Sequence, residues 1–348
     1  ATLPLPVLEK AREEMLDYRG SGMSVMEVSH RGAVFDEMAE RTEACLRRLL
    51  SVSEDYAVLF LAGGATTQFT QVPLNLAEAG RPGAYVINGS WSRKAYAIAS
   101  RLGLAHKVAS SDADGFRTIP PADEWDLEGD FAYLHYASNE TIGGVQFPGP
   151  PECDLPLVSD MSSDILSRPV EVDRFGAIYA GAQKNIGPAG ITLVIVRNDL
   201  LDRVRPNNPH LMTWKAYADS DSMTNTPPTF AWYVADLVFQ WLLDAGGLDS
   251  MAEVNERKAA KLYRAIDASS FYRNPVALDC RSWMNVPFIL ADSALDSAFL
   301  EESAAAGLTN LKGHRSVGGM RASIYNAVSE GAVDALIEFM AEFERTNG

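Results

Sequence analysis

Cysteine is scarce in this 348-residue chain, which contains Cys45, Cys153 and Cys280 and no CxxC pair. This spacing excludes a disulfide-stapled scaffold and a zinc finger, and it fits a reducing compartment. Long apolar runs are absent too. The stretch 191–196 is among the longest, whereas a transmembrane helix needs roughly 20 apolar residues. Because the first residues also lack the basic-then-apolar pattern of a signal peptide, the sequence predicts a cytoplasmic protein without a membrane span.

Positive charge is in short supply as well. The chain has 30 Lys and Arg residues against 46 Asp and Glu residues, for a formal net charge of −16. Nucleic acids and anionic membranes bind to basic protein faces, so this balance argues against both as partners. An anionic substrate would therefore need positive side chains that are gathered locally against the overall field.

Short apolar runs alternate with helical or turn segments through the first half of the chain. The runs lie at 57–61, 85–87, 132–136, 157–158, 177–180 and 191–196. Runs this short, followed by Gly, Asn or Ser, are typical of buried parallel strands. Strands that alternate with helices predict an α/β fold with a doubly wound, mainly parallel sheet. Ligands bind at the carboxyl ends of such strands, so the residues that follow each run are candidates for a site.

Helical periodicity and a second α+β pattern flank this region. Helices are predicted at 6–20, 34–50, 230–245 and 248–268, and a polar loop at 207–228. The tail is read as a strand at 285–290, a helix at 294–306, a strand at 320–324 and a helix at 331–345. We therefore expect a large domain of residues 11–246 and a small α+β domain of residues 247–348 joined by residues 1–10.

A lysine and an aspartate each follow a predicted strand. Lys184 lies in the segment YAGAQKNIGPAG (179–190), where Gly and Ala leave room beside it. Such a lysine is easily desolvated, which lowers its pKa so that the neutral amine can attack an aldehyde. Asp160 caps the short strand predicted at 157–158. Pyridoxal-phosphate (PLP) enzymes need a carboxylate that pairs with the pyridine nitrogen. The alternatives are a surface lysine and a helix N-cap, and the pairing of the two residues favours the PLP site.

Further candidates follow other strands. A glycine pair at 63–64 precedes Ala65 and Thr66 at a helix start, where free backbone N–H groups can hold a phosphate. Trp91 follows the run at 85–87 and can stack on a planar ring, the alternative being a core or interface tryptophan. Thr141 is placed to donate to the oxygen of such a ring.

Positive residues cluster in two places despite the acidic composition. His30 and Arg31 are adjacent in the first connection, and His314 and Arg315 lie a few residues before Arg321. Arginine forks form bidentate bonds with carboxylates and phosphates. These clusters predict one carboxylate and one phosphate subsite, and the alternative is a set of solvated surface charges.

The chain resembles the phosphoserine aminotransferases, which are fold-type I PLP enzymes, over essentially its whole length. The segments that carry the resemblance are SVMEVSHR (24–31), VPLNL (72–76), NETI (139–142), ILSRP (165–169), YAGAQKNIGPAG (179–190), NTPPTF (225–230) and KGHRSVGGMRASIYN (312–326). So many ordered matches are far more specific than any single motif.

The resemblance implies PLP as cofactor, an obligate homodimer with shared active sites, and no metal. Lys184 would be the catalytic Schiff-base lysine, with Asp160 on the ring nitrogen and Trp91 stacked on the ring. The other implied cofactor contacts are Ala65, Thr66 and Gln183 on the phosphate, Thr141 near the ring oxygen, and Asn225 and Thr226 on the cofactor phosphate of the other subunit. The implied substrate contacts are Arg321 for the carboxylate, and His30, Arg31, His314 and Arg315 for the phosphate, some of them from the partner.

The implied reaction transfers the amino group of L-glutamate to 3-phosphohydroxypyruvate and yields O-phospho-L-serine and 2-oxoglutarate. A phosphorylated four-carbon oxo acid of pyridoxine synthesis is a second candidate substrate. Some relatives carry an arginine where this chain has Thr66, so backbone donors and the neighbouring subunit would contribute more to phosphate binding here. The alternatives are an alanine–glyoxylate aminotransferase, a cysteine desulfurase with a reactive Cys in a mobile loop, and a non-catalytic PLP-binding protein with a decayed site. The last of these predicts the loss of Lys184, Asp160 or Arg321, and all three are present.

Overall fold

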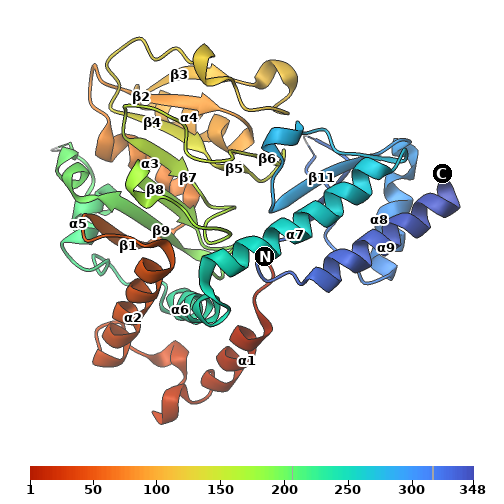
Figure 1. Ribbon diagram of the computed structural model, residues 1–348. Helices are drawn as coiled ribbons and strands as arrows, with labels where there is room; N and C mark the ends of the chain where they lie inside the picture. Colours follow the sequence, from red (N-terminus) through yellow and green to blue (C-terminus); the bar gives the residue numbers. More distant parts are fainter. Residues whose placement is uncertain (206, 316) are drawn as a thin grey trace.

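The structure is a computed structural model that describes residues 1–205, 207–315 and 317–348. A seven-stranded sheet with the order β1-β9-β8-β7-β4-β2-β3 forms the centre of the larger part of the chain (Figure 1). Its strands are β1 (Tyr56–Gly63), β2 (Gly83–Ile87), β3 (Ala105–Ser110), β4 (Tyr133–Ala137), β7 (Leu157–Asp160), β8 (Phe175–Gly181) and β9 (Gly190–Arg197). A short hairpin of β5 (Asn139–Glu140) and β6 (Val145–Gln146) follows β4.

The sheet is mainly parallel, which confirms the predicted fold class. Strand β9 is the exception, because it pairs antiparallel with both β1 and β8. The prediction that the run at 191–196 is a parallel strand is therefore wrong. Only residues 182–189 separate β8 from β9, too few for the crossover of a dozen or more residues that a parallel neighbour requires. Strand β3 was not predicted, because it lies at the sheet edge and most of its side chains are not buried.

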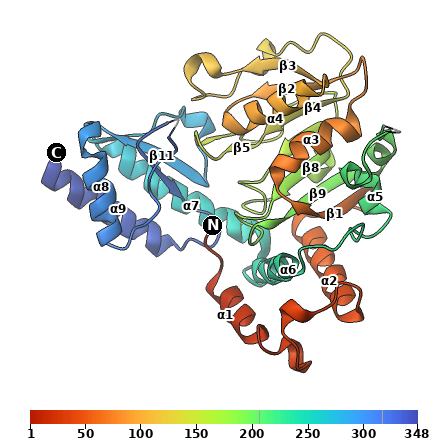
Figure 2. The ribbon, with the colours of Figure 1, turned by 180° about the vertical axis from the view of Figure 1, so that it is seen from behind.

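Helices cover both faces of this sheet (Figures 1 and 2). They are α2 (Ala33–Leu50), α3 (Ala65–Leu76), α4 (Ser90–Arg101), α5 (Trp214–Ala218) and α6 (Thr229–Asp244), whereas α1 (Leu5–Glu14) packs on α6. One core cluster joins α2 and α6 to one face, and a second joins α3, α4 and α5 to the other. Neighbouring strand residues alternate between the clusters; Ile178 belongs to the first and Tyr179 to the second, as the two-residue period of a strand requires.

Two helix predictions need correction. The first helix ends at Glu14 rather than Gly20, and the expected polar loop at 207–228 contains the short helix α5, which buries Trp214 and Tyr217. We also expected the N-terminal helix to pack on the small domain. It contacts α6 instead, and Val7 belongs to the same core cluster as α2 and α6.

The C-terminal part combines the three-stranded antiparallel sheet β10-β11-β12 with helices. Its elements are β10 (Tyr272–Arg273), β11 (Asn285–Leu290), β12 (Met320–Ser323), α7 (Gly247–Ala268), α8 (Asp296–Ala305) and α9 (Glu330–Asn347). Helix α7 connects the two parts of the molecule (Figure 1). Leu248 and Met251 at its start belong to the core of the large sheet, whereas its residues from Ala259 onward belong to the core of the small one.

Within the described ranges, no helix is both long and apolar enough to cross a lipid bilayer.

Candidate active site

The candidate site lies at one edge of the large sheet, where the strands that run in the same direction end. Asp160 is the last residue of β7, and Lys184 follows the end of β8. Helix α3 begins directly after β1, and α4, which carries Trp91, begins shortly after β2. Carboxyl ends of parallel strands meet at one edge, so the topology brings together residues that are far apart in sequence.

A cavity at this edge contains most of the predicted cofactor residues. Its lining consists of Gly64, Ala65, Thr66, Trp91, Asn139, Thr141, Asp160, Ser162, Ser163, Gln183 and Lys184. Seven of these were predicted from the sequence, and their roles remain predictions. Gly64, Asn139, Ser162 and Ser163 were not given a role. Gly64 precedes Ala65, Asn139 is the first residue of the NETI segment, and the two serines follow Asp160 at distances of two and three positions.

Lys184 has the properties of a lysine that can react as a neutral amine. Its Nζ donates a hydrogen bond to Oγ1 of Thr141 at 2.6 Å. Burial lowers the pKa of the Lys184 amine to about 8, while the nearby carboxylates of Asp160 and Glu140 act in the opposite direction. Desolvation outweighs these charges, because the free energy of hydration that the charged amine loses on burial exceeds its attraction to the two carboxylates. The amine is therefore neutral at a lower pH than an exposed lysine.

Asp160 is held in a fixed position opposite this amine. Its Oδ1 accepts hydrogen bonds from the backbone N–H of Ser162 at 2.9 Å and from the Ser162 hydroxyl at 2.6 Å. The same hydroxyl oxygen accepts from the N–H of Gly181 at 3.0 Å, which ties the end of β7 to the end of β8. Burial raises the pKa of the Asp160 carboxyl, and the bonds from Ser162 and the charge of Lys184 counteract it. A carboxylate in this setting is suited to pair with a protonated ring nitrogen.

Glu140 is a site residue that the sequence reasoning missed. Its side chain is fully buried and accepts bonds from the backbone N–H groups of Trp91 and Ser92 and from the Ser92 hydroxyl, at 2.7–3.0 Å. The carboxylate thereby holds the first turn of α4, which carries Trp91. Gly89 makes room for it, because a Cβ there would lie 2.3 Å from the Glu140 side chain. Glu140 lies in the NETI segment (139–142), for which the sequence predicts a role of Thr141 alone.

The start of α3 forms the end of the cavity suited to a phosphate. Gly64 is the N-cap of this helix, and Ala65 is its first residue. The first N–H groups of a helix have no acceptor within it and attract anions. Gly181 packs against this turn so closely that a Cβ there would lie 3.4 Å from the Ala65 nitrogen and 2.8 Å from Oε1 of Gln183.

The predicted substrate residues lie in different parts of the described chain. Arg321 reaches the site, since its Nη1 donates to the carbonyl oxygen of Thr141 at 3.3 Å, and its Nε is buried without a hydrogen-bond partner among the described residues. His30 is half-buried, and Arg31 is exposed just before α2. The two other predicted phosphate contacts, His314 and Arg315, are exposed ahead of β12.

The predicted contacts to a neighbouring cofactor lie outside the cavity. Asn225 and Thr226 are exposed in the segment that leads into α6. Within the described chain they do not line the cavity that contains Lys184.

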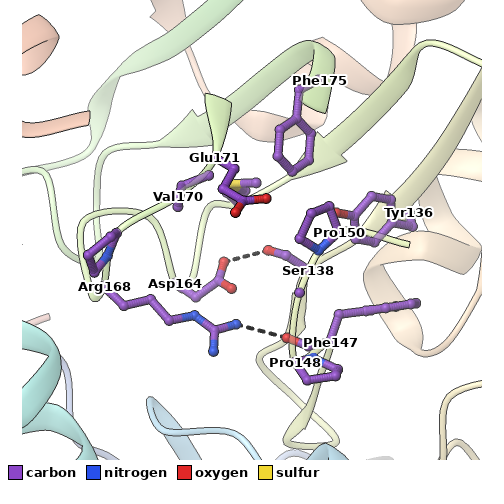
Figure 3. A pocket seen from close by; sticks show the side chains of 13 residues that line it. Tyr136, Ser138, Phe147, Pro148, Pro150, Asp164, Arg168, Val170, Glu171 and Phe175 are labelled. Atoms are coloured by element: carbon purple, nitrogen blue, oxygen red, sulfur yellow. Dashed lines mark hydrogen bonds between the residues drawn. The ribbon is translucent and has the colours of Figure 1, made fainter. Parts of the chain in front are cut away.

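A larger cavity of about 500 Å³ lies beside this site and has a different character (Figure 3). Asp164 and Ser138 are hydrogen-bonded to each other at its wall, and Nη2 of Arg168 donates to the carbonyl oxygen of Phe147. The described residues that line it include no lysine. We therefore assign the chemistry to the smaller cavity, which has the amine.

The groups in the smaller cavity fit pyridoxal phosphate. Lys184 offers an amine for the aldehyde, Asp160 a carboxylate for the ring nitrogen, and the start of α3 N–H donors for the phosphate. Trp91 supplies an aromatic surface, and its Nε1 is buried without a partner in the described chain. No group of three or more metal-ligating side chains gathers among the described residues.

Comparisons with known proteins agree with this assignment. A family model described as "Aminotransferase class-V" matches residues 1–336. A phosphoserine aminotransferase from Azotobacter vinelandii is 56% identical over 349 residues, which cover 100% of this chain and 97% of that protein. The structure of a phosphoserine aminotransferase from Bacillus circulans subsp. alkalophilus superposes with a TM-score of 0.97 at 46% identity, covering 100% and 97% of the two chains. A PLP-bound phosphoserine aminotransferase from Trichomonas vaginalis gives a TM-score of 0.94 at 41% identity, covering 98% and 97%.

The fold and the site thus define a PLP-dependent aminotransferase. The chain belongs to the class-V aminotransferases and, within them, to the phosphoserine aminotransferases. This confirms the resemblance that the sequence motifs indicated, and it removes the non-catalytic alternative. A desulfurase is disfavoured by the cysteines as well, because Cys280 is buried and burial raises the pKa of its thiol to about 11, whereas a reactive cysteine needs an accessible thiolate.

Proposed function

We propose that this enzyme transfers the amino group of L-glutamate to 3-phosphohydroxypyruvate and produces O-phospho-L-serine and 2-oxoglutarate. One observation of the structure carries this proposal: Thr141 contacts Lys184 through its hydroxyl group and Arg321 through its carbonyl oxygen. A substrate whose carboxylate binds to the Arg321 guanidinium therefore has its α-carbon close to the Lys184 amine. The similarity to phosphoserine aminotransferases along the whole chain supports the choice of substrates.

The residues of the site divide the chemistry among them. When bound, pyridoxal phosphate supplies an aldehyde and an electron-withdrawing ring. The Lys184 amine would hold the cofactor in the absence of substrate, and its Nζ would move the proton at the substrate α-carbon. Asp160 keeps the ring nitrogen protonated, and Arg321 orients the substrate through its carboxylate.

The phosphate subsite that we propose draws on two subunits. His30 and Arg31 precede α2, whereas His314 and Arg315 precede β12. Both views of the molecule show α2 and the small-domain sheet on opposite sides of α6 (Figures 1 and 2). One chain therefore does not join the two clusters, and a homodimer would bring one cluster of each subunit to the same substrate.

The exposed positions of Asn225 and Thr226 support the same arrangement. Neither side chain lines the cavity of its own chain, and both could bind the cofactor phosphate of a partner subunit. This contribution would replace the arginine that some relatives have at the position of Thr66. We also infer a cytoplasmic location from the substrates and the acidic, cysteine-poor chain.

An absorbance titration of the purified, PLP-loaded protein tests this function. O-Phospho-L-serine should bleach the band of the lysine-bound cofactor at concentrations where L-serine and L-alanine leave it unchanged. Equal bleaching by L-alanine would reject the phosphate subsite and restore an alanine–glyoxylate exchange. Arg31→Ala should weaken the response to O-phospho-L-serine far more than the response to L-glutamate. The phosphorylated four-carbon amino acid of the pyridoxine route, run in parallel, shows whether the same subsites accept the longer substrate.

A further inference from the structure

A buried turn directly after the Asp160 strand adopts an unusual backbone conformation. Leu166 has a φ of +62° and its side chain is 0% exposed. A leucine in the left-handed region is strained and persists only where its surroundings hold it in place. The contacts of this turn therefore have to be specific.

Three asparagines provide these contacts, each by donating its side-chain amide to one carbonyl oxygen of residues 165–167. Asn185 binds the first at 3.0 Å, Asn326 the second at 2.8 Å and Asn255 the third at 2.9 Å. All three asparagine side chains are buried. Three consecutive carbonyls in a turn have no partners from regular secondary structure, so these amides satisfy groups that would otherwise be costly to bury.

The asparagines also bind to one another. The backbone N–H of Asn326 donates to Oδ1 of Asn185 at 3.1 Å, and Nδ2 of Asn255 donates to Oδ1 of Asn326 at 2.9 Å. Asn326 is thus the centre of the network. A displacement of any one of the three changes the bonds of the other two.

The network joins the two halves of the active site. Asn185 is the residue after Lys184, and Asn326 follows the strand β12, which carries Arg321. Asn255 lies on α7 between the part of the helix that belongs to the large core and the part that belongs to the small core. The strained turn itself follows Asp160. Buried hydrogen bonds therefore connect the segments that carry Asp160, Lys184 and Arg321.

Helix α7 fixes the Asn326 segment at a second point. Lys258, one turn after Asn255, is completely buried and donates to the carbonyl oxygens of Ile324, Tyr325 and Val328 at 3.0–3.2 Å. The chain on both sides of Asn326 is therefore attached to α7.

We propose that Asn185, Asn255 and Asn326 are positioning residues that set the place of Arg321 relative to Lys184. This proposal rests on the proposed carboxylate role of Arg321. None of the three asparagines lines the cavity that contains Lys184. They act by fixing the position of β12, which carries Arg321, relative to the turn that carries Lys184. Loss of the network should leave the Lys184 amine intact and misplace the substrates that Arg321 holds.

The test compares a probe that needs only Lys184 with substrates that also need Arg321. The PLP-loaded variants Asn326→Ala and Asn255→Ala are treated with hydroxylamine, which has no carboxylate, and separately with L-glutamate and O-phospho-L-serine. Hydroxylamine should release the cofactor at a rate within about twofold of the wild type. The kcat/KM for both amino acids should fall on the order of tenfold to hundredfold, since a misplacement of about 1 Å can cost that much.

Asn274→Ala is the matched control. Asn274 is also buried in the small domain and donates its amide to a carbonyl oxygen, that of Pro287. The described hydrogen bonds of its side chain, to Pro287 and Val276, both lie within the small domain. This variant should be less stable, but its rates with hydroxylamine and with the two amino acids should not change by different factors. Amide hydrogen exchange of the cofactor-free protein gives a second readout: Asn326→Ala should accelerate exchange at both 165–167 and 324–328, and Asn274→Ala at neither.

Three outcomes would overturn the proposal. Equal losses with hydroxylamine and the amino acids would mean that the network supports Lys184 itself. Unchanged amino-acid kinetics in both alanine variants, or the same separation in Asn274→Ala, would remove the positioning role. If the wild type reacts with L-glutamate but not with O-phospho-L-serine, the proposed phosphate subsite fails, while the L-glutamate and hydrogen-exchange comparisons still decide about the network.

Discussion

The amine of Lys184 lies 2.6 Å from the hydroxyl oxygen of Thr141, a hydrogen bond between the turn after β8 and the hairpin after β4. The carbonyl oxygen of the same threonine accepts a bond from Arg321. Thr141 therefore lies between the group that reacts with the cofactor and the group that we expect to hold the substrate. The predictions below test the residues on either side of it.

Replacing Lys184 should separate cofactor binding from catalysis. In Lys184→Ala we expect kcat to fall by about 10²–10⁴-fold or more, because the group that transfers the proton is lost. Borohydride reduction of the PLP-loaded wild type followed by mass spectrometry should place the cofactor on Lys184, and the variant should carry no covalent label. Lys107→Ala, an exposed lysine at the sheet edge, should behave as the wild type. A label on another lysine in the wild type would contradict the assignment.

The reaction of the cofactor-free protein with PLP should depend on pH in a characteristic way. Burial lowers the pKa of Lys184 to about 8, so the neutral amine accumulates as the pH approaches 8 and the rate should level off above it. The carboxylate of Asp160 favours the charged amine, and Asp160→Asn should therefore move the half-maximal rate to lower pH. Nα-acetyl-lysine serves as the reference amine. A protein rate that keeps rising to pH 10, as for that reference, would contradict the lowered pKa.

Glu140 should prove essential to the helix start that presents Trp91. Glu140→Ala leaves the N–H groups of Trp91 and Ser92 buried without their acceptor, at a cost of about 1–3 kcal/mol for each unsatisfied group. Chemical denaturation of the cofactor-free protein should show this loss, and the affinity for PLP should fall with it. Glu301→Gln on the exposed face of α8 should change neither quantity. Unaltered stability of Glu140→Ala would show that water replaces the carboxylate.

Shared active sites predict that two inactive variants complement each other. Lys184→Ala and Arg31→Ala should each be inactive with O-phospho-L-serine as homodimers. If Arg31 acts across the interface, a hybrid dimer has one complete site, and random mixing should restore about a quarter of the wild-type activity. Lys184→Ala mixed with Arg321→Ala should restore none, because Lys184 and Arg321 serve the same site from one chain. Restoration in the second mixture, or none in the first, would contradict the shared arrangement.

Much of the fold was predictable because the strands of a doubly wound sheet are buried on both faces. The runs around Ile178, Tyr179 and Leu193 are almost entirely apolar, and their short length and this composition indicate buried strands. Strand β3 has no such signal, since an edge strand is covered on fewer sides. The direction of β9 was also hidden, because the apolar content of a strand is the same in both directions, and only the short connection after β8 indicates the reversal.

The sequence by itself determined the chemistry of this protein, because a strand-end lysine, a strand-end aspartate and a glycine turn place an amine, a carboxylate and anion-binding N–H groups at one edge of any parallel sheet. The tertiary structure decided what supports them. Glu140 became significant only when the fold brought its carboxylate to the start of α4, and Leu166 only when its backbone was seen in the left-handed region. Residues such as Asn185, Asn255 and Asn326 bind through long-range hydrogen bonds, and hydrogen bonds between distant segments leave no periodic pattern along a chain.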